Sequence, residues 1–390
     1  MTLPERFDEF AEARRNGFLK VMELKESGAN ICGSFCQYAP AEVIYAAGLY
    51  KVSLCGKSNA PIATAETHLP ANLCPLIKAS YGHALEDSCP YAYFSDVVVG
   101  ETTCDGKKKM YELLGKLKPM QVIHLPNVPD KERSLDAWVK EIKHFKEALE
   151  ERFDVEITDE KLHEAIKWCN KERIQAARIY ELGRYDPPAI TGLDMRNVMD
   201  GEQYMFNKYE KYEKLKQILD ECEENWKNGN GPYKPNAKPP RILISGAGLG
   251  GVVDKTIAVI EELGGAIVCY EGCSGIVSRR RLVDESDERD PITCIAEKYL
   301  EVPCAVMSPN HNRMSQIEAT IAEWQVEGLI NITLHSCLPF GIESCNIEKV
   351  CKKCHTPYLH IETDFSTGDA GQIRTRIEAF LEMVLERRLM

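Results

Sequence analysis

The stretch Asp96-Val-Val-Val-Gly-Glu-Thr-Thr-Cys-Asp-Gly-Lys-Lys-Lys-Met-Tyr-Glu-Leu-Leu-Gly-Lys-Leu117 decides the fold class. Residues 96–99 form a short, nearly continuous apolar run, which is typical of a strand that is buried on both faces. The run leads through a turn with Gly and Cys into a helical pattern over residues 108–117. A buried strand followed directly by a helix predicts a parallel, doubly wound α/β sheet.

The same alternation continues on both sides of this stretch. We expect a polar helix at about residues 5–27, a loop at 33–36, a helix at 41–47, and strands at 51–54 and 121–124. Short apolar runs that alternate with helices predict an N-terminal α/β domain over residues 1–129.

The middle and the end of the chain differ in character. Residues 130–228 favour a helical segment, since apolar side chains recur at spacings of three and four in 135–149 and charged helical patterns follow at 159–183 and 201–227. Residues 229–240 are rich in Gly, Pro and Asn and predict a linker. Residues 241–390 predict a second α/β domain, with strands at 241–244, 266–269, 304–306, 328–332 and 358–361. We therefore expect two Rossmann-like domains that face a cleft, with a helical insertion.

Composition restricts the class of protein. The 390 residues are 44% hydrophobic and 28% charged, as in ordinary globular enzymes, and the net charge of −12 disfavours nucleic acid or an anionic membrane as a partner. The N-terminus lacks the apolar core of a signal peptide, and apolar runs stay below the ~18 to 20 residues that span a bilayer. A cytoplasmic protein is expected.

The sixteen cysteines are the main indication of chemistry. In a reducing compartment, so many thiols favour metal binding or redox chemistry over disulfides, although we expect roughly half to be small buried hydrophobes. Cys74, Cys104, Cys273, Cys304 and Cys337 share one setting, because each follows an apolar run and stands close to Gly or Pro. The carboxyl ends of parallel strands meet at one crevice, so these thiols indicate an iron–sulfur site that the fold assembles.

Cys104 lies at the turn that leads from strand to helix. The amide dipoles of a helix start favour thiolate over thiol, and Lys107, Lys108 and Lys109 either stabilise a negative cluster or form a solvated first turn.

Two motifs have other interpretations. The sequence Gly246-Ala-Gly-Leu-Gly-Gly251, with Glu271 further on, matches a dinucleotide-binding fingerprint, but Glu271 runs directly into Gly272 and Cys273. Cys351-Lys-Lys-Cys354-His355 matches a haem-attachment motif and could also bind zinc. We interpret the first as part of the thiol-lined crevice and the second as two surface thiols.

A nucleophilic cysteine enzyme is a further alternative. His335 stands two residues before Cys337, but neighbours at that spacing seldom form a productive hydrogen bond. We expect His335 to make a polar contact near the site instead.

Several motifs together resemble those of a known superfamily. They are Gly33-Ser-Phe-Cys-Gln-Tyr-Ala-Pro-Ala-Glu42, Leu69-Pro-Ala-Asn-Leu-Cys-Pro-Leu-Ile-Lys78, Gly100-Glu-Thr-Thr-Cys-Asp-Gly-Lys-Lys-Lys109 and Leu334-His-Ser-Cys337. The chain resembles the 2-hydroxyacyl-CoA dehydratase and benzoyl-CoA reductase superfamily over nearly its whole length. Within that superfamily it is most similar to the double-cubane cluster proteins.

The resemblance implies a homodimer and a set of cluster ligands. Cys74, Cys104 and Cys337 match the three cysteines with which dehydratase subunits hold a [4Fe-4S] cluster. A double-cubane [8Fe-9S] cluster requires six thiolates, and we choose Cys36, Cys273 and Cys304 as the other three because each lies in a loop of similar setting. The next choices are Cys345, Cys89 and Cys55.

The resemblance also implies an activity. A separate iron–sulfur activator that hydrolyses ATP would supply electrons, since this chain has no Gly-x-x-x-x-Gly-Lys-[Ser/Thr] loop. The reduced cluster would then reduce small, unreactive molecules. The alternatives are a subunit of a radical 2-hydroxyacyl-CoA dehydratase with one [4Fe-4S] cluster, and a low-potential electron carrier without a substrate.

Overall fold

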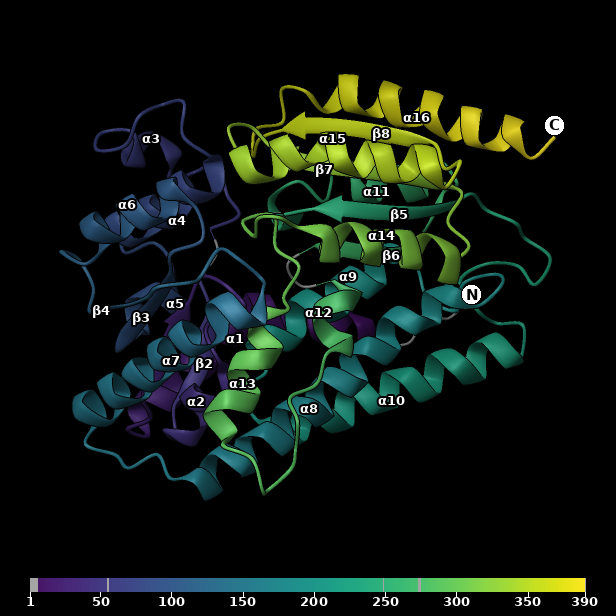
Figure 1. Ribbon diagram of the computed structural model, residues 1–390. Coiled ribbons are helices and arrows are strands. Elements are labelled where there is room, and N and C mark those ends of the chain that lie inside the picture. The colour runs from purple at the N-terminus through teal and green to yellow at the C-terminus, as the bar shows by residue number, and fades with distance from the viewer. Residues whose placement is uncertain (1–5, 55, 248, 273–274, 390) are drawn as a thin grey trace.

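The chain folds around two parallel sheets, which confirms the expected α/β class (Figure 1). The computed structural model describes residues 6–54, 56–247, 249–272 and 275–389. Within them the N-terminal sheet has the order β2-β1-β3-β4, with β1 (Ile31–Ser34), β2 (Tyr50–Ser53), β3 (Val97–Glu101) and β4 (Met120–Ile123). The C-terminal sheet has the order β6-β5-β7-β8, with β5 (Arg241–Gly246), β6 (Ala266–Gly272), β7 (Gly328–Leu334) and β8 (Tyr358–Thr363). The two sheets therefore repeat one topology.

Helices follow the strands and cover the sheets. Around the first sheet lie α1 (Arg6–Glu26), α2 (Ala41–Ala46), α3 (Ile62–Ala65), α4 (Pro75–Leu85), α5 (Pro90–Phe94) and α6 (Asp105–Leu114). The middle of the chain forms α7 (Lys131–Phe153), α8 (Asp159–Glu181), α9 (Gly192–Gly201) and α10 (Lys208–Lys227), with the short 3₁₀ turns η1 (Leu182–Arg184) and η2 (Glu202–Tyr204). The last part adds η3 (Leu249–Gly251), α11 (Ile257–Glu262), α12 (Ile276–Arg280), α13 (Pro291–Leu300), α14 (His311–Glu323), α15 (Leu338–Lys353) and α16 (Ala370–Arg387).

The central strands are buried along their whole length. All residues of β3 and β7 are buried, because helices cover both faces of a parallel sheet. Side chains cap the long helices where the chain enters them: Asp130 accepts from two amides at the start of α7, and Thr158 and Asn207 cap α8 and α10.

One helix of the C-terminal part packs on the N-terminal part. In α13, Ile292, Ile295 and Tyr299 share a core with Val97 and Val99 of β3, and with α7. Figure 1 shows α13 beside α2 and α7, away from the C-terminal sheet. The helix therefore joins the two lobes, and the domain boundaries at residues 129, 228 and 240 stay a prediction.

Three expected elements differ from the observed ones. We expected a loop at residues 33–36, whereas residues 31–34 form strand β1, which includes Gly33 and Ser34. A Cβ at Gly33 would lie 2.4 Å from Leu54 Cδ1, so the glycine allows close packing. Residues 304–306 are not a strand, because Pro303 lacks an amide N–H and the Cys304 and Met307 amides bond locally to Val302 O and Cys304 O. The helix expected at 201–227 begins at Lys208 and is preceded by α9 and η2.

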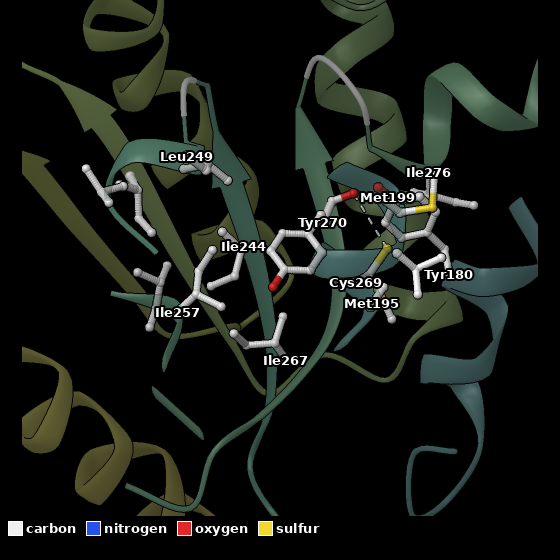
Figure 2. Packing of buried hydrophobic residues seen from close by; sticks show 14 of the residues in the cluster. Tyr180, Met195, Met199, Ile244, Leu249, Ile257, Ile267, Cys269, Tyr270 and Ile276 are labelled. Carbon is white, nitrogen blue, oxygen red and sulfur yellow. Dashed lines mark hydrogen bonds between the residues drawn. The ribbon is translucent and has the colours of Figure 1, made fainter. Parts of the chain in front are cut away.

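Several cysteines serve as buried hydrophobes. Figure 2 shows Cys269 of β6 in the core with Ile244, Ile267, Met195 and Tyr180. Cys351 is also fully buried, so its assignment as a surface thiol was wrong, because it shares the inner face of α15 with Ile347. All fourteen cysteines in the described residues are free thiols.

Within the described residues, no helix combines the length and the apolar character needed to cross a bilayer.

Candidate metal centre

Three cysteines stand directly before the first residue of a helix. Cys74 precedes α4, Cys104 precedes α6 and Cys337 precedes α15. Backbone amides of the first helical turn face each sulfur: those of Leu76 and Ile77 at Cys74, that of Lys107 at Cys104, and that of Phe340 at Cys337. Such amides stabilise negative charge on sulfur.

The fold brings these three thiols close to one another. The Cys74 and Cys337 side chains form a hydrogen bond, which lowers the pKa of Cys74 to about 7 and raises that of Cys337. Cys104 lies near enough to interact electrostatically with Cys74 and Cys337, while burial raises its pKa. Cys337 comes from the C-terminal sheet and the other two come from the N-terminal part, so the group lies between the lobes.

Two further expected ligands lie next to this group. The charge of a Cys304 thiolate raises the pKa of both Cys104 and Cys36, so Cys304 lies close enough to interact electrostatically with each of them. Burial in the crevice raises the pKa of Cys36 to about 12. The thiols of Cys36, Cys74, Cys104, Cys304 and Cys337 thus form one connected set, to which both lobes contribute.

One of the three lysines after Cys104 faces the thiols. Lys107 lowers the thiol pKa of Cys36, Cys74 and Cys104 through its charge. Lys108 and Lys109 are exposed and pair with Asp105 and Glu112 on the helix surface. The first lysine therefore belongs to the site, and the other two solvate the helix.

The remaining candidates divide into two groups. Cys273 and Cys55 lie outside the described residues, although Gly272 and Gly275 on either side of Cys273 line the cavity described below. Cys345 is exposed on α15, and Cys89 is half-buried before the short helix α5.

Among the described residues, no three His, Cys, Asp or Glu side chains already stand in an arrangement that could hold a metal ion. The donor set nevertheless fits an iron–sulfur group, because thiolates are its usual ligands and amide N–H groups directed at sulfur stabilise its negative charge. The residues present are therefore compatible with such a cluster.

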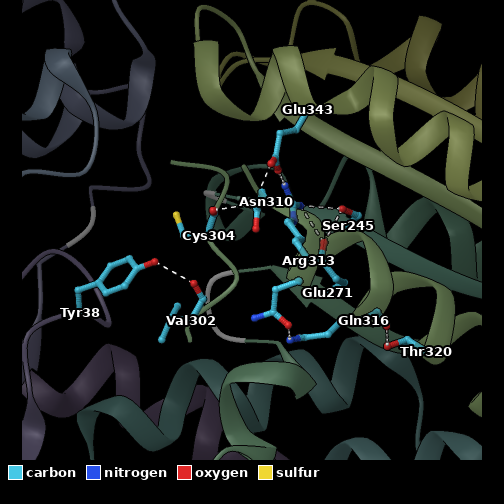
Figure 3. A network of polar contacts seen from close by, with 11 residues as sticks. Tyr38, Ser245, Glu271, Val302, Cys304, Asn310, Arg313, Gln316, Thr320 and Glu343 are labelled. Atoms are coloured by element: carbon cyan, nitrogen blue, oxygen red, sulfur yellow. Dashed lines mark hydrogen bonds and ion pairs between the residues drawn. The ribbon is translucent and has the colours of Figure 1, made fainter. Parts of the chain in front are cut away.

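A buried polar network holds the C-terminal thiol loops (Figure 3). The Arg313 guanidinium donates to both carboxylate oxygens of Glu271, at 2.9 Å each, and to Glu343. Asn310 donates to Glu343 at 2.7 Å and to the carbonyl oxygen of Cys304 at 2.8 Å. Arg313 thus connects the end of β6, the Cys304 loop and α15.

This network decides against the dinucleotide interpretation. In a dinucleotide site the acidic residue after the second strand binds a ribose hydroxyl, whereas both Glu271 oxygens are taken by Arg313 and by Ser245. His335 likewise faces Asp364, at 3.9 Å, rather than a thiol.

A cavity of about 310 Å³ opens beside the thiols. Its lining includes Ser34, Gly246 and Gly272, which end strands of both sheets, and Cys36 and Lys107 of the thiol site. Ligands of open α/β sheets bind at this edge.

Sequence reasoning missed the residues that support the site. Arg313 and Tyr38 have partners far away in the chain, and Lys298 stands singly in α13, so no local pattern indicates any of the three. Only the fold pairs Tyr38 with Val302 and Arg313 with Glu271.

The fold and the site define a two-lobed α/β protein with cysteines at the carboxyl ends of its strands. The family model described as 2-hydroxyglutaryl-CoA dehydratase, D-component, matches residues 36–384. The chain therefore belongs to this family, which confirms the resemblance to the 2-hydroxyacyl-CoA dehydratases.

Individual relatives cover nearly the whole chain. It is 43% identical to the putative dehydratase subunit YjiM of Escherichia coli K12, over 98% of both chains. It is 26% identical to the (R)-phenyllactyl-CoA dehydratase beta subunit of Clostridium sporogenes, over 96% of this chain and 98% of that one. Identity to the (R)-2-hydroxyglutaryl-CoA dehydratase beta subunit of Acidaminococcus fermentans is 23%, over 98% and 100% of the two chains.

Proposed function

We propose that this protein is an iron–sulfur redox enzyme that holds an [8Fe-9S] double-cubane cluster between its two lobes and reduces small, unreactive molecules there. The observation that carries the proposal is the connected set of five thiols, Cys36, Cys74, Cys104, Cys304 and Cys337. A single cubane held by three cysteines would leave two of them unused. Cys273 is the sixth ligand of the proposal.

The chain's own residues have separate tasks in this proposal. The six cysteines hold the cluster, which when bound would supply one-electron reduction at low potential. The amides at the starts of α4, α6 and α15, together with Lys107, stabilise negative charge on the sulfurs. The cavity beside Cys36 holds the molecule to be reduced and limits its size.

The proposed partners follow from the family. A separate activator would hydrolyse ATP and deliver electrons, and two copies of this chain would form a homodimer. We place the protein in the cytoplasm, where thiols stay reduced until a cluster is assembled on them.

A second candidate is a subunit of a radical 2-hydroxyacyl-CoA dehydratase with one [4Fe-4S] cluster. The names of three relatives, all beta subunits of such dehydratases, favour it. So does the electrostatic interaction of Cys104 with Cys74 and Cys337, since all three cysteines stand at similar helix starts. In this case Cys36 and Cys304 would be bystanders.

Iron and sulfide analysis of anaerobically prepared protein, combined with Cys304→Ser, separates the two candidates. The double cubane predicts about eight irons per chain and a marked loss in the variant. The dehydratase predicts about four irons per chain in both proteins. Turnover of a small molecule that depends on activator, ATP and reductant would exclude a simple electron carrier.

A further inference from the structure

The cavity carries an excess of positive charge in an acidic protein. Eight lysine and arginine side chains and four acidic ones line it among the described residues, although the chain has a net charge of −12. One of the four acids, Glu271, is committed to Arg313, which does not line the cavity. A cleft of low dielectric with an excess of cations attracts anions.

Some of the lining cations already have acidic partners. Asp200 serves both Lys57, at 3.2 Å, and Arg196, at 2.9 Å. Glu202 pairs with Arg279 at 2.7 Å, and Arg173 pairs with Glu42 at 2.5 Å. These residues form the framework of the cavity wall.

Lys298 differs from these lining cations because no acidic side chain in the described part of the chain pairs with it. It lines the cavity and is 8% exposed, yet within the described residues its amine makes no hydrogen bond and no ion pair. The amine lies 4.0 Å from the centre of the Tyr299 ring, and the hydroxyl of that ring donates to Glu42 at 2.9 Å. The Glu42 carboxylate, whose charge acts on Lys298, is thus already shared between Tyr299 and Arg173.

The surroundings oppose a charge on this amine. Burial and then the Arg173 guanidinium on α8 hold the pKa of Lys298 well below its ordinary value, and Arg279 on α12 and Lys51 on β2 act in the same direction. Glu42 on α2 opposes them. A buried amine in this position gains a proton readily when an anion arrives.

Apolar side chains also line the cavity and can contact a carbon skeleton. Phe35, Tyr50, Met205 and Phe206 contribute apolar surface, and the Tyr50 and Phe206 rings meet edge to face at 6.5 Å between their centroids. A ligand that contacts both the basic and the apolar lining residues needs a negative group and a short carbon skeleton.

We propose that this cavity binds a small organic carboxylate and that Lys298 receives a proton and pairs with the carboxylate when it binds. The inference rests on the proposed function in one respect, since the carboxylate is taken to be the molecule that the cluster acts on. The binding step itself requires only the cavity and can be measured separately.

The test is calorimetric titration of the full-length protein with succinate, its uncharged isostere succinamide, and inorganic phosphate, at pH 7.5 in two buffers of different ionisation enthalpy. Wild-type protein is expected to bind succinate at least about tenfold more tightly than succinamide or phosphate, and to take up protons as succinate binds. Lys298→Met should lose both the preference and the proton uptake. Lys349→Met, at an exposed position on α15, should keep both.

Failure of the carboxylate-binding inference can be distinguished from failure of the proposed iron–sulfur function, because iron is measured on the same preparation. Equal binding of succinate and succinamide, preferential binding of phosphate, or wild-type binding by Lys298→Met would overturn the inference, whatever the iron content. Selective succinate binding by a preparation that cannot be loaded with iron would leave the inference standing and contradict the proposed function. Should Lys298→Met fail to fold, proton uptake by the wild type decides, and its absence would overturn the inference.

Discussion

At the scale of single residues, Arg313 carries a charge that is almost wholly removed from water. Its side chain is 1% exposed and lies between the carboxylates of Glu271 and Glu343. Removing one member of a buried ion network leaves its partners charged and unpaired. The cost of such a change is larger than that of losing any single surface pair.

We therefore expect Arg313→Met to lower the free energy of unfolding by roughly 3 to 5 kcal/mol, as measured by urea denaturation. The triple variant with Glu271→Gln and Glu343→Gln should recover part of this loss, because the unpaired carboxylates are gone. Lys353→Met, which breaks the exposed pair with Glu318, serves as the control and should leave stability unchanged. If the single Arg313→Met variant were as stable as the wild type, the Arg313 network would not contribute to the free energy of unfolding.

Cys104 gives the corresponding test of the metal centre. Cys104→Ala removes a sulfur that interacts electrostatically with Cys74, Cys304 and Cys337, so we expect iron binding to be abolished. Cys222→Ala is the matched control, because Cys222 is buried in α10 among hydrophobic residues. The check is iron content and electron paramagnetic resonance of anaerobic protein, and full iron in Cys104→Ala contradicts its role as a ligand.

At the scale of elements, the sequence predicts best those helices and strands whose formation depends on the local pattern of apolar and turn residues. The strand β3 and the helix α6 follow from an apolar run and a turn, and so does the helix start that carries Cys104, whereas no helix was predicted to begin at Cys74 or Cys337. Strand β1 was missed because Gly33 does not form a turn; a glycine stands there because Leu54 packs against the backbone at this position. The Cys304 segment was mistaken for a strand because its local hydrogen bonds cannot be read from apolar residues alone. The positions of α13 and Arg313 depend on partners far along the chain.

The start of α9 provides a prediction about pH. Glu261 of α11 accepts from the amides of Gly192 and Leu193, at 2.5 and 3.2 Å, and burial raises its pKa from 4.5 to about 7. The folded protein therefore binds this proton more tightly than the unfolded chain does. The stabilising contribution of the proton is complete below pH 4.5 and is lost as the pH rises through about 7.

Relative to Glu261→Gln, the wild type should consequently lose on the order of 3 kcal/mol of stability between pH 4.5 and pH 8. Urea denaturation across this range measures the difference. Glu262→Gln, at the exposed neighbouring position, should follow the wild-type curve. A constant difference between the wild type and Glu261→Gln would contradict the assigned shift.

At the scale of the whole molecule, the two lobes are joined close to the thiols. Tyr38, two residues after Cys36, donates its hydroxyl to the carbonyl of Val302, two residues before Cys304, at 2.9 Å (Figure 3). One hydrogen bond thus connects the two loops whose cysteines distinguish the double cubane from the single cluster.

Tyr38→Phe removes that hydrogen bond and keeps the aromatic ring. We expect a loss of about 1 kcal/mol in the free energy of unfolding. Iron should also be removed faster by a chelator, because the Cys36 and Cys304 loops are less firmly held together. Tyr212→Phe is the control, since the hydroxyl of Tyr212 makes no hydrogen bond within the described residues. Equal rates of iron loss from Tyr38→Phe and from the wild type would show that this hydrogen bond does not help to retain the cluster.

The most direct measurement is an anaerobic crystal structure with anomalous scattering data collected at the iron edge. Our account predicts one strong iron signal between the lobes, large enough for about eight irons and bounded by Cys36, Cys74, Cys104, Cys273, Cys304 and Cys337. A signal for four irons held by Cys74, Cys104 and Cys337 alone would contradict the double cubane, and no iron between the lobes would contradict the metal centre itself.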